Sequence, residues 1–167
     1  MKRKSRPPTS TYTIPALAVA TVAAFCLASC DHGLVVPDEV LPGAIAGVVT
    51  YVHGSDDWPP DSTLYDIRFV ALRFVPTDTA DFLQLNRMEI SDRLSTRVAR
   101  DSFLIRDVAP GVFPYSGVAY QYSANFFNWK PVGLSEGNGG VFTVKDGETT
   151  HVSVVVDFDN PPIFPPQ

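Results

Sequence analysis

Few residues in this chain could do chemistry, and metal ligands are the first class to consider. The three histidines are His32, His53 and His151, and none of them has the short spacing of a metal-binding pair on one helix. A zinc site would require His53 and His151 to meet in space, whereas exposed histidines on strands are the commoner arrangement. The sequence therefore predicts no metal site and no cofactor.

A group of oxygen-bearing side chains offers the ligands that calcium prefers, and all of them lie in predicted loops. They are Asp56, Asp57, Asp61, Asp157, Asp159 and Asn160. Their order does not follow the helical calcium loop, in which ligands recur at alternate positions around a central glycine. We therefore expect solvated turn residues at strand ends, and a calcium site is the alternative.

Catalytic signatures are absent from the sequence. There is no Gly-x-Ser-x-Gly turn for a serine nucleophile, no phosphate-binding Walker loop and no dinucleotide-binding glycine pattern. Paired carboxylates of a glycoside hydrolase are defined by their separation in space, and nothing in the sequence selects one pair. The sequence predicts no catalytic residue and a protein that is not an enzyme, with an unrecognised hydrolase as an alternative.

Aromatic residues are the stronger candidates for binding. Trp58 lies in a loop rich in proline and aspartate, and Phe126, Phe127 and Trp129 lie close together in a second loop. Exposed aromatic rings stack on sugars or anchor a protein partner, whereas packing inside the fold is their ordinary role. These four residues are the predicted ligand-binding set.

Cys30 ends a leader-like segment. Lys2, Arg3, Lys4 and Arg6 precede an apolar stretch from Ile14 to Leu27, which is shorter than the roughly 20 residues that a spanning helix needs. The run Leu27-Ala28-Ser29-Cys30 resembles the lipobox of bacterial lipoprotein precursors, and Cys26 is the poorer candidate because bulky Phe25 precedes it. The resemblance implies removal of residues 1–29, acylation of Cys30 and a lipid anchor outside the cytoplasm.

Cleavage after Ser29 would leave 138 residues with nine basic and 18 acidic side chains, and so a net charge of −9. A chain of that length fits one domain, and its charge repels phosphate backbones, so nucleic-acid binding is not expected. The only remaining cysteine would be the acylated one, and stability must therefore come from an apolar core. Residues 30–42 would form a short tether that keeps the domain near the membrane.

Alternating apolar residues predict strands along most of residues 43–158. We expect strands at 43–53, at 64–75, around Phe103 to Val108 and over 112–124, and a closing hairpin that pairs 141–144 with 149–158. Val152, Val154, Val156 and Phe158 should face inward. Residues 81–88 suggest a short helix, 94–98 an edge strand and 125–140 an irregular loop. The proline-rich tail, 159–167, should hang free.

These elements predict an all-β protein, a single antiparallel β-sandwich of about seven strands. Three short motifs also resemble the transthyretin-like sandwich of carboxypeptidase regulatory-like domains: Ile45-x-Gly-x-Val49, Phe103-x-Ile105-x-x-Val108-x-Pro110-Gly111-x-Phe113, and Phe142-x-Val144-x-x-Gly147. The resemblance implies a core position for Phe113, and residues 77–100 and 125–140 depart from the pattern as insertions.

The functional expectation is a membrane-anchored lipoprotein of the cell envelope, exposed on the periplasmic side or the outer surface. Its sandwich would be a non-catalytic binding or structural module. The leading partner is another envelope protein, and a glycan bound through the loop aromatics is the alternative. A groove shared by residues 77–100 and 125–140 would favour ligand binding.

Overall fold

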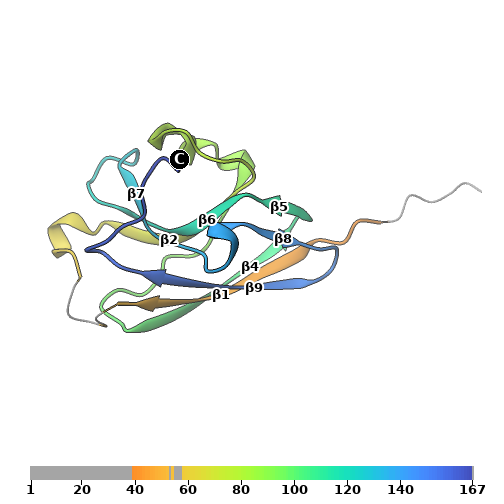
Figure 1. Ribbon diagram of the computed structural model, residues 1–167, viewed down its shortest axis with the longest axis horizontal. Helices are drawn as coiled ribbons and strands as arrows, with labels where there is room; N and C mark the ends of the chain where they lie inside the picture. The colour runs from red at the N-terminus through yellow and green to blue at the C-terminus, as the bar shows by residue number, and fades with distance from the viewer. Residues whose placement is uncertain (1–38, 53, 55–57, 167) are drawn as a thin grey trace, which may run out of the picture. The chain divides into compact units, whose positions relative to one another are not determined.

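The computed structural model describes residues 39–52, 54 and 58–166. These residues form nine strands, and the elements longer than a turn are all strands (Figure 1). The strands are β1 (Gly43–Tyr51), β2 (Asp66–Leu72), β3 (Met88–Ile90), β4 (Arg100–Val108), β5 (Gly111–Phe113), β6 (Tyr115–Gln121), β7 (Trp129–Leu134), β8 (Phe142–Val144) and β9 (Thr149–Val156). The 3₁₀ turns are η1 (Asp61–Thr63), η2 (Thr79–Leu83), η3 (Leu85–Arg87) and η4 (Asn138–Gly140).

Two sheets face each other and form the predicted β-sandwich. The three-stranded sheet has the order β4-β1-β9 and the four-stranded sheet the order β3-β2-β6-β7, while β5 and β8 make a separate pair. Figure 1 shows the two larger sheets as layers, with η2, η3 and the C-terminal residues on the outer side of the four-stranded sheet. The number of strands exceeds the predicted seven because several of them are only three residues long.

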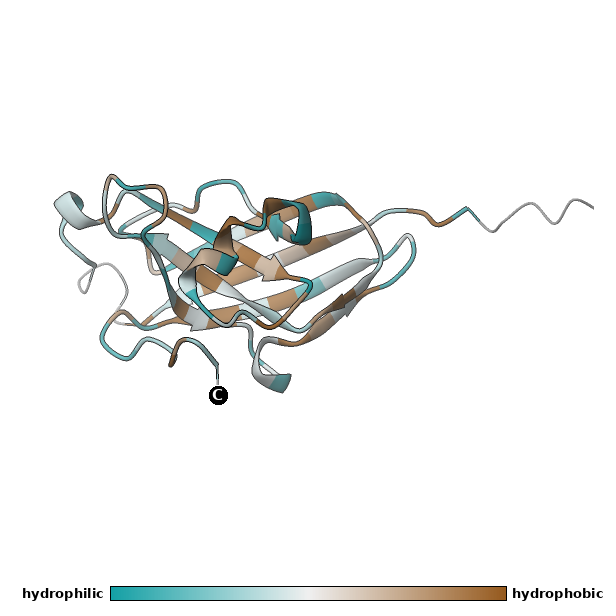
Figure 2. Cartoon of the chain, turned by 90° about the horizontal axis from the view of Figure 1, so that it is seen from above, coloured by the Kyte–Doolittle hydropathy of each residue, from teal (hydrophilic) through white to brown (hydrophobic). Residues whose placement is uncertain are grey.

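The core between the sheets follows from the period-two alternation of side chains along each strand. In β1, Ile45, Val49 and Tyr51 are buried, and in β2 the inward residues are Ile67 and Phe69. In Figure 2 apolar and polar colours alternate along the strands. The inward positions predicted for β9 are confirmed, since Val154 and Val156 are fully buried and Val152 and Phe158 pack against the same core.

The aromatic residue after the Pro110-Gly111 turn lies in the core, as the resemblance implied. Phe113 is completely buried, and its ring stacks on Phe142 with 5.1 Å between centroids. The guanidinium carbon of Arg73, which directly follows β2, lies 4.4 Å from the centre of the Phe113 ring. Phe113 and Phe142 come from the paired strands β5 and β8, and the small sheet joins the core because Phe113 belongs to it and Phe142 packs against it.

The predicted closing hairpin is wrong. Strand β8 pairs with β5, whereas β9 runs parallel to β1, with Ala46 opposite His151 and Val49 opposite Val154. The turn at 145–148 therefore carries the chain from one sheet to another instead of reversing it within a sheet. Local turn chemistry can predict the reversal, but it cannot choose the partner of each strand, which depends on burial across the whole sandwich.

Residues 125–140 were predicted as an irregular loop and contain a strand, β7. It pairs with β6 at the edge of the four-stranded sheet, and a bulge between Val118 and Ala119 in the pairing register leaves Val132 as the extra residue. Pro131 sits at this bulge, and proline is tolerated there because edge strands and bulges leave backbone N–H groups unpaired. Val132 is buried, so the strand contributes to the core.

Residues 77–100 also differ from expectation. The predicted short helix at 81–88 is replaced by two 3₁₀ turns, η2 and η3, and strand β3 follows them. Residues 94–98 do not form the predicted edge strand. The backbone N–H of Leu94 donates to Ile67 O at 2.9 Å, but the chain then turns away, with a positive φ of 58° at Arg97.

The proline-rich C-terminal residues do not hang free. They form no strand, as predicted, but the ring of Phe164 packs against Phe82 at 5.2 Å and against Tyr115 at 6.3 Å between centroids. With Val70, Leu72, Met88 and Ala119 these rings belong to a second apolar cluster on the outer side of the four-stranded sheet. Proline prevents pairing in a ladder, but it does not prevent side-chain packing.

Candidate functional site

Trp58 is a core residue. Its side chain is buried, and its ring lies 4.4 Å from that of Tyr51 and 5.1 Å from that of Phe158. The indole N–H donates to the carbonyl oxygen of Gly54 at 3.0 Å, which satisfies the one polar atom of the ring. Trp58 therefore closes one end of the core between the sheets and presents no open face for a ligand.

Phe126 and Phe127 are exposed at the tip of the loop between β6 and β7. They retain 54% and 59% of their accessible surface, and their rings meet edge to face at 6.1 Å. Hydrogen bonds inside the loop hold this tip, since Asn128 Nδ2 donates to Ser123 Oγ at 2.7 Å and Phe127 N donates to Asn125 Oδ1 at 3.0 Å. The local polar residues thus position two apolar rings in water.

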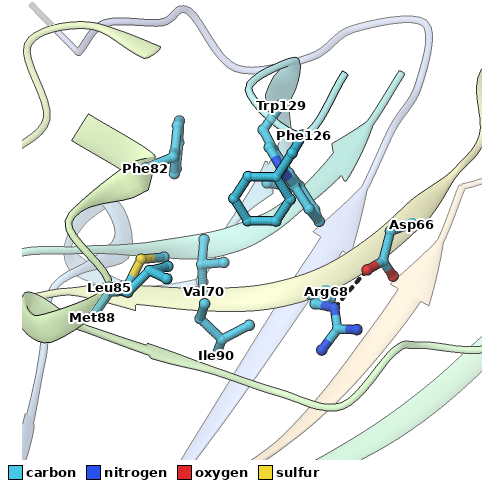
Figure 3. Close-up of a pocket in the computed structure, with 10 residues that line it drawn as sticks. Asp66, Arg68, Val70, Phe82, Leu85, Met88, Ile90, Phe126 and Trp129 are labelled. Carbon is cyan, nitrogen blue, oxygen red and sulfur yellow. Dashed lines mark hydrogen bonds and ion pairs between the residues drawn. The ribbon is translucent and has the colours of Figure 1, made fainter. Parts of the chain in front are cut away.

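A groove of about 290 Å³ lies beside this loop, on the outer side of the four-stranded sheet. The groove is lined by Asp66, Arg68, Val70, Phe82, Leu85, Met88, Ile90, Ala119, Phe126 and Trp129. Figure 3 shows Phe126 and Trp129 on one side, Phe82, Leu85 and Met88 on the other, and Val70 between them. The two insertions, 77–100 and 125–140, therefore do share a groove, on a floor made by β2 and β6.

The pleat of β2 explains which of its residues reach the groove. Ile67 and Phe69 point into the core, so their neighbours Asp66, Arg68 and Val70 point outward. Phe69 is held in register by its backbone N–H, which donates to the buried hydroxyl of Ser91 at 3.0 Å. One strand thus serves both the core and the groove.

The turn η2 carries Phe82 to the groove wall and is capped at its start. Asp78 accepts a hydrogen bond from Ala80 N at 2.7 Å, and the carboxylate of Asp81 accepts one from Thr77 N at 2.7 Å. The hydrogen bond from Thr77 N lowers the pKa of Asp81, and further donors at Asp78 and Gln84 add to the effect. These bonds fix a segment too short to be stable as a helix alone.

The charged groups of the groove lie together at one end and satisfy each other. Arg68 Nε and Asp66 Oδ2 are 2.7 Å apart (Figure 3). Arg68 Nη1 also donates to Ser91 O at 3.1 Å. Arg93 Nε approaches the other oxygen of Asp66 at 3.8 Å. The remaining lining is apolar, so the groove suits an apolar group better than a ligand with many hydroxyls.

The candidate metal and calcium residues do not assemble within the described part of the chain. His151 points outward from β9, while His32, His53, Asp56 and Asp57 lie outside the described residues. Asp61 pairs with Arg97 at 2.7 Å, and Asp157 accepts the N–H groups of Asp159 and Asn160 at 3.0 Å each. Within residues 39–52, 54 and 58–166, no three histidine, cysteine or acidic side chains are placed to hold a metal.

Two buried hydroxyls also have shifted acidity. Burial raises the pKa of Tyr51, with a further increase from the charge of Asp101, and burial raises the pKa of Tyr115. Both phenols therefore stay protonated at neutral pH, so neither can serve as a general base.

In the part of the chain that the structure describes, no helix is long and apolar enough to cross a membrane.

The sequence placed two of its four candidate binding residues at the groove, Phe126 and Trp129; Phe127 lies on the neighbouring loop tip and Trp58 in the core. It missed the opposite wall, which Phe82, Leu85, Met88 and Ile90 supply. The available signal was the density of apolar residues in a segment with no clear period.

Comparisons with family models, with curated proteins and with solved structures gave no match.

Proposed function

We propose that this chain is a lipid-anchored protein of the bacterial cell envelope whose β-sandwich binds another envelope protein without catalysing a reaction. The groove is the observation that carries the binding part of the proposal. Its walls come from two insertions into the sandwich, and they leave apolar side chains open to solvent beside a floor that is already packed. Exposed apolar surface of this kind marks interaction sites on proteins.

The chemistry of the groove supports a protein partner over a glycan. Sugars need several hydrogen-bonding groups beside an aromatic platform, whereas the charged side chains of this lining, Asp66 and Arg68, already bond to each other and the other residues are apolar except for the indole N–H of Trp129. Trp58 and Trp129, the platform considered from the sequence, belong to separate apolar clusters on opposite faces of the four-stranded sheet. An apolar side chain of a partner protein fits the groove with fewer unsatisfied groups.

A site-specific photo-crosslinker tests the groove directly. Placed at Phe126 in cells that make the full chain, it should yield one defined crosslinked protein, identified by mass spectrometry. The matched control places the same group at Val112, which is equally exposed but lies on β5 outside the groove. Equal yields from both positions would contradict the proposal.

A substitution in the opposite wall sharpens this test. Leu85 is 55% exposed, so Leu85→Glu should cost little stability. The substitution places a charge in the groove wall that would have to be buried when the partner binds. The yield of the crosslinked protein from position 126 should therefore fall at least about tenfold. An unchanged yield from the folded variant would show that the partner does not use the groove.

The glycan alternative has its own readout. Trp58→Phe leaves Trp129 as the only tryptophan, and its fluorescence should respond to any sugar that enters the groove. We expect no change with soluble envelope glycans. A saturable change that Phe126→Ala removes would replace the protein partner with a glycan.

The anchor is tested separately. Cells that make the full chain and take up a labelled fatty acid should label it, Cys30→Ala should abolish the label, and Cys26→Ala should retain it. Label that survives Cys30→Ala would contradict the anchor without affecting the groove.

A further inference from the structure

The outer edge of β4 is the longest strand edge that the described residues leave open. Strand β4 has nine residues and is the last strand of the three-stranded sheet on its side. The other side of that sheet is protected, because the residues that follow β7 lie beside β9: Ser135 bridges Val154, and Glu136 N donates to Ser153 O at 2.8 Å. The two sides of the same sheet therefore differ in how their backbone groups are satisfied.

Two backbone hydrogen bonds fix the direction of the peptide N–H and C=O groups along β1. Tyr51 N donates to Ala99 O, which lies next to β4, while Ala44 N donates to Glu148 O, which precedes β9, both at 3.0 Å. The backbone N–H and C=O groups of successive residues point to opposite sides of a strand. Odd-numbered residues of β1 therefore bond to β4, and even-numbered residues bond to β9.

The same alternation fixes the direction in which the backbone N–H and C=O groups of β4 point. Phe103 lies opposite Gly47 and Ile105 opposite Ile45, so both point their backbone groups toward β1. Ser102 and Leu104 therefore point theirs outward. The N–H of Ser102 donates to Asp101 Oδ1 at 2.8 Å, whereas the outward groups of Leu104 meet no partner among the described residues. Such groups are a template for another strand.

A hollow of about 340 Å³ lies directly beside this edge. It is lined by β4 on one side and by residues 92–94 on the other, and Leu94 is buried beneath it. Residues 94–98 leave the four-stranded sheet here instead of continuing as a strand, which opens the space. Side chains of an added strand that point toward the core would enter this hollow.

We propose that the edge of β4 binds an extended strand of another protein by continuing the three-stranded sheet. Arg100 and Arg106 stand on the exposed face of β4, six residues apart, and neither forms an ion pair among the described residues. Acidic residues opposite them would complete the pairs. The partner strand is therefore apolar at alternate positions and acidic at both ends.

A second copy of this chain fits the edge poorly. Two β4 strands paired antiparallel about Phe103 would place Arg100 opposite Arg106 of the other copy, and pairing about Leu104 would place Asp101 opposite Asp107. Like charges directly opposite each other destabilise a strand pair. In these two registers the like charges therefore favour a different chain over a second copy.

A designed peptide tests the proposal on the full chain in detergent micelles. The acidic peptide Glu-Val-Thr-Val-Thr-Val-Glu places its two carboxylates six residues apart, opposite Arg106 and Arg100 in an antiparallel pairing. It should bind saturably and slow hydrogen exchange at the Leu104 amide. The same peptide with lysine at both ends should bind about tenfold more weakly. No binding of the acidic peptide would overturn the proposal.

Two variants separate strand addition from non-specific attraction. Leu104→Pro removes the outward N–H without removing a bond to β1, so binding should be lost while the chain stays folded. The double change Arg100→Glu and Arg106→Glu should reverse the preference, with the lysine peptide binding more tightly. A preference unchanged by this reversal would overturn the proposal even if the proline variant fails to fold. Leu85→Glu in the groove should leave peptide binding unaltered.

Discussion

The outer faces of the two sheets differ in what covers them. On the three-stranded sheet the outward residues of β1 are small, Ala44, Ala46 and Val48, and within the described residues no segment of the chain packs over them. The four-stranded sheet has large apolar residues on its outer face, and Phe82 and Phe164 cover part of them. The groove lies where Phe82 and Phe164 leave the outer face of the four-stranded sheet uncovered.

This difference follows from β2, whose last four residues are all buried. A strand with two apolar faces must be covered on both, because about 25 cal/mol is lost for each Å² of apolar surface left in water. Strand β1 has small or polar residues on its outer face and needs no cover. The core between the sheets should therefore dominate stability, and the outer cluster should contribute locally.

The largest expected effect is that of emptying the shared core. Phe69 is fully buried, and its ring stacks on Phe103 across the two sheets at 4.3 Å. Phe69→Ala should lower the free energy of unfolding by about 4 kcal/mol, measured by urea denaturation. The exposed Phe127→Ala is the control and should change it by less than about 0.5 kcal/mol. Similar losses from both would place the core elsewhere.

The contact between β7 and β9 is the next test, because there the sheets join along one side. A Cβ atom on Gly133 would collide with the carbonyl oxygen of Val155, a backbone atom that cannot move aside without distorting β9. Gly133→Ala should therefore cost about 3 kcal/mol in the same measurement. The control is Gly137→Ala, where nothing lies within 4 Å of the added atom, although its φ of 78° adds local strain. A smaller loss at Gly133 than at Gly137 would show that this side of the sandwich is loose.

Removing part of the cover should have a smaller and more local effect. Phe82 is buried, but it packs on the outer cluster from a 3₁₀ turn and not from a strand. Phe82→Ala should lower the free energy of unfolding by about 2 kcal/mol and speed hydrogen exchange mainly over residues 79–90. Hydrogen exchange that accelerates equally in β1 would show that the outer apolar cluster is not energetically separate from the core between the sheets.

Sequence reasoning succeeded where the two-residue alternation of apolar side chains decides the structure. The alternation in β9 identified its inward residues, and the resemblance carried by the motif around Pro110-Gly111 implied the core position of Phe113. It failed where partners come from far along the chain. Neither the parallel pairing of β9 with β1 nor the pairing of β8 with β5 leaves a local signal. Pro131 concealed β7, because a proline inside a strand is permitted only by an edge or a bulge that the sequence does not display.

The candidate site divides in the same way. Phe126 and Trp129 were found because aromatic residues in a polar loop are conspicuous, whereas Phe82 and Met88 were missed because 3₁₀ turns have too few residues to show a period. Trp58 became a binding candidate because it lies in a loop rich in proline and aspartate, and the tail was expected to hang free because of its prolines. Both Trp58 and Phe164 pack through their rings although their backbones pair with no strand.

The smallest expected effect concerns the cap that holds the cover in place. The pKa of Asp81 is lowered mainly by the hydrogen bond from Thr77 N, so the folded carboxyl binds its proton less tightly than the unfolded one. Its contribution is therefore present above the unfolded pKa of about 3.9 and is lost as pH falls through the lower, folded value. An NMR titration should show this low pKa, with the Thr77 amide exchanging faster as the group is protonated. Asp81→Asn should remove the pH dependence at Thr77 and leave the exchange of β1 unchanged. A normal pKa at Asp81 would mean that η2 is held by Phe82 alone, and the groove wall would then depend on packing and not on its cap.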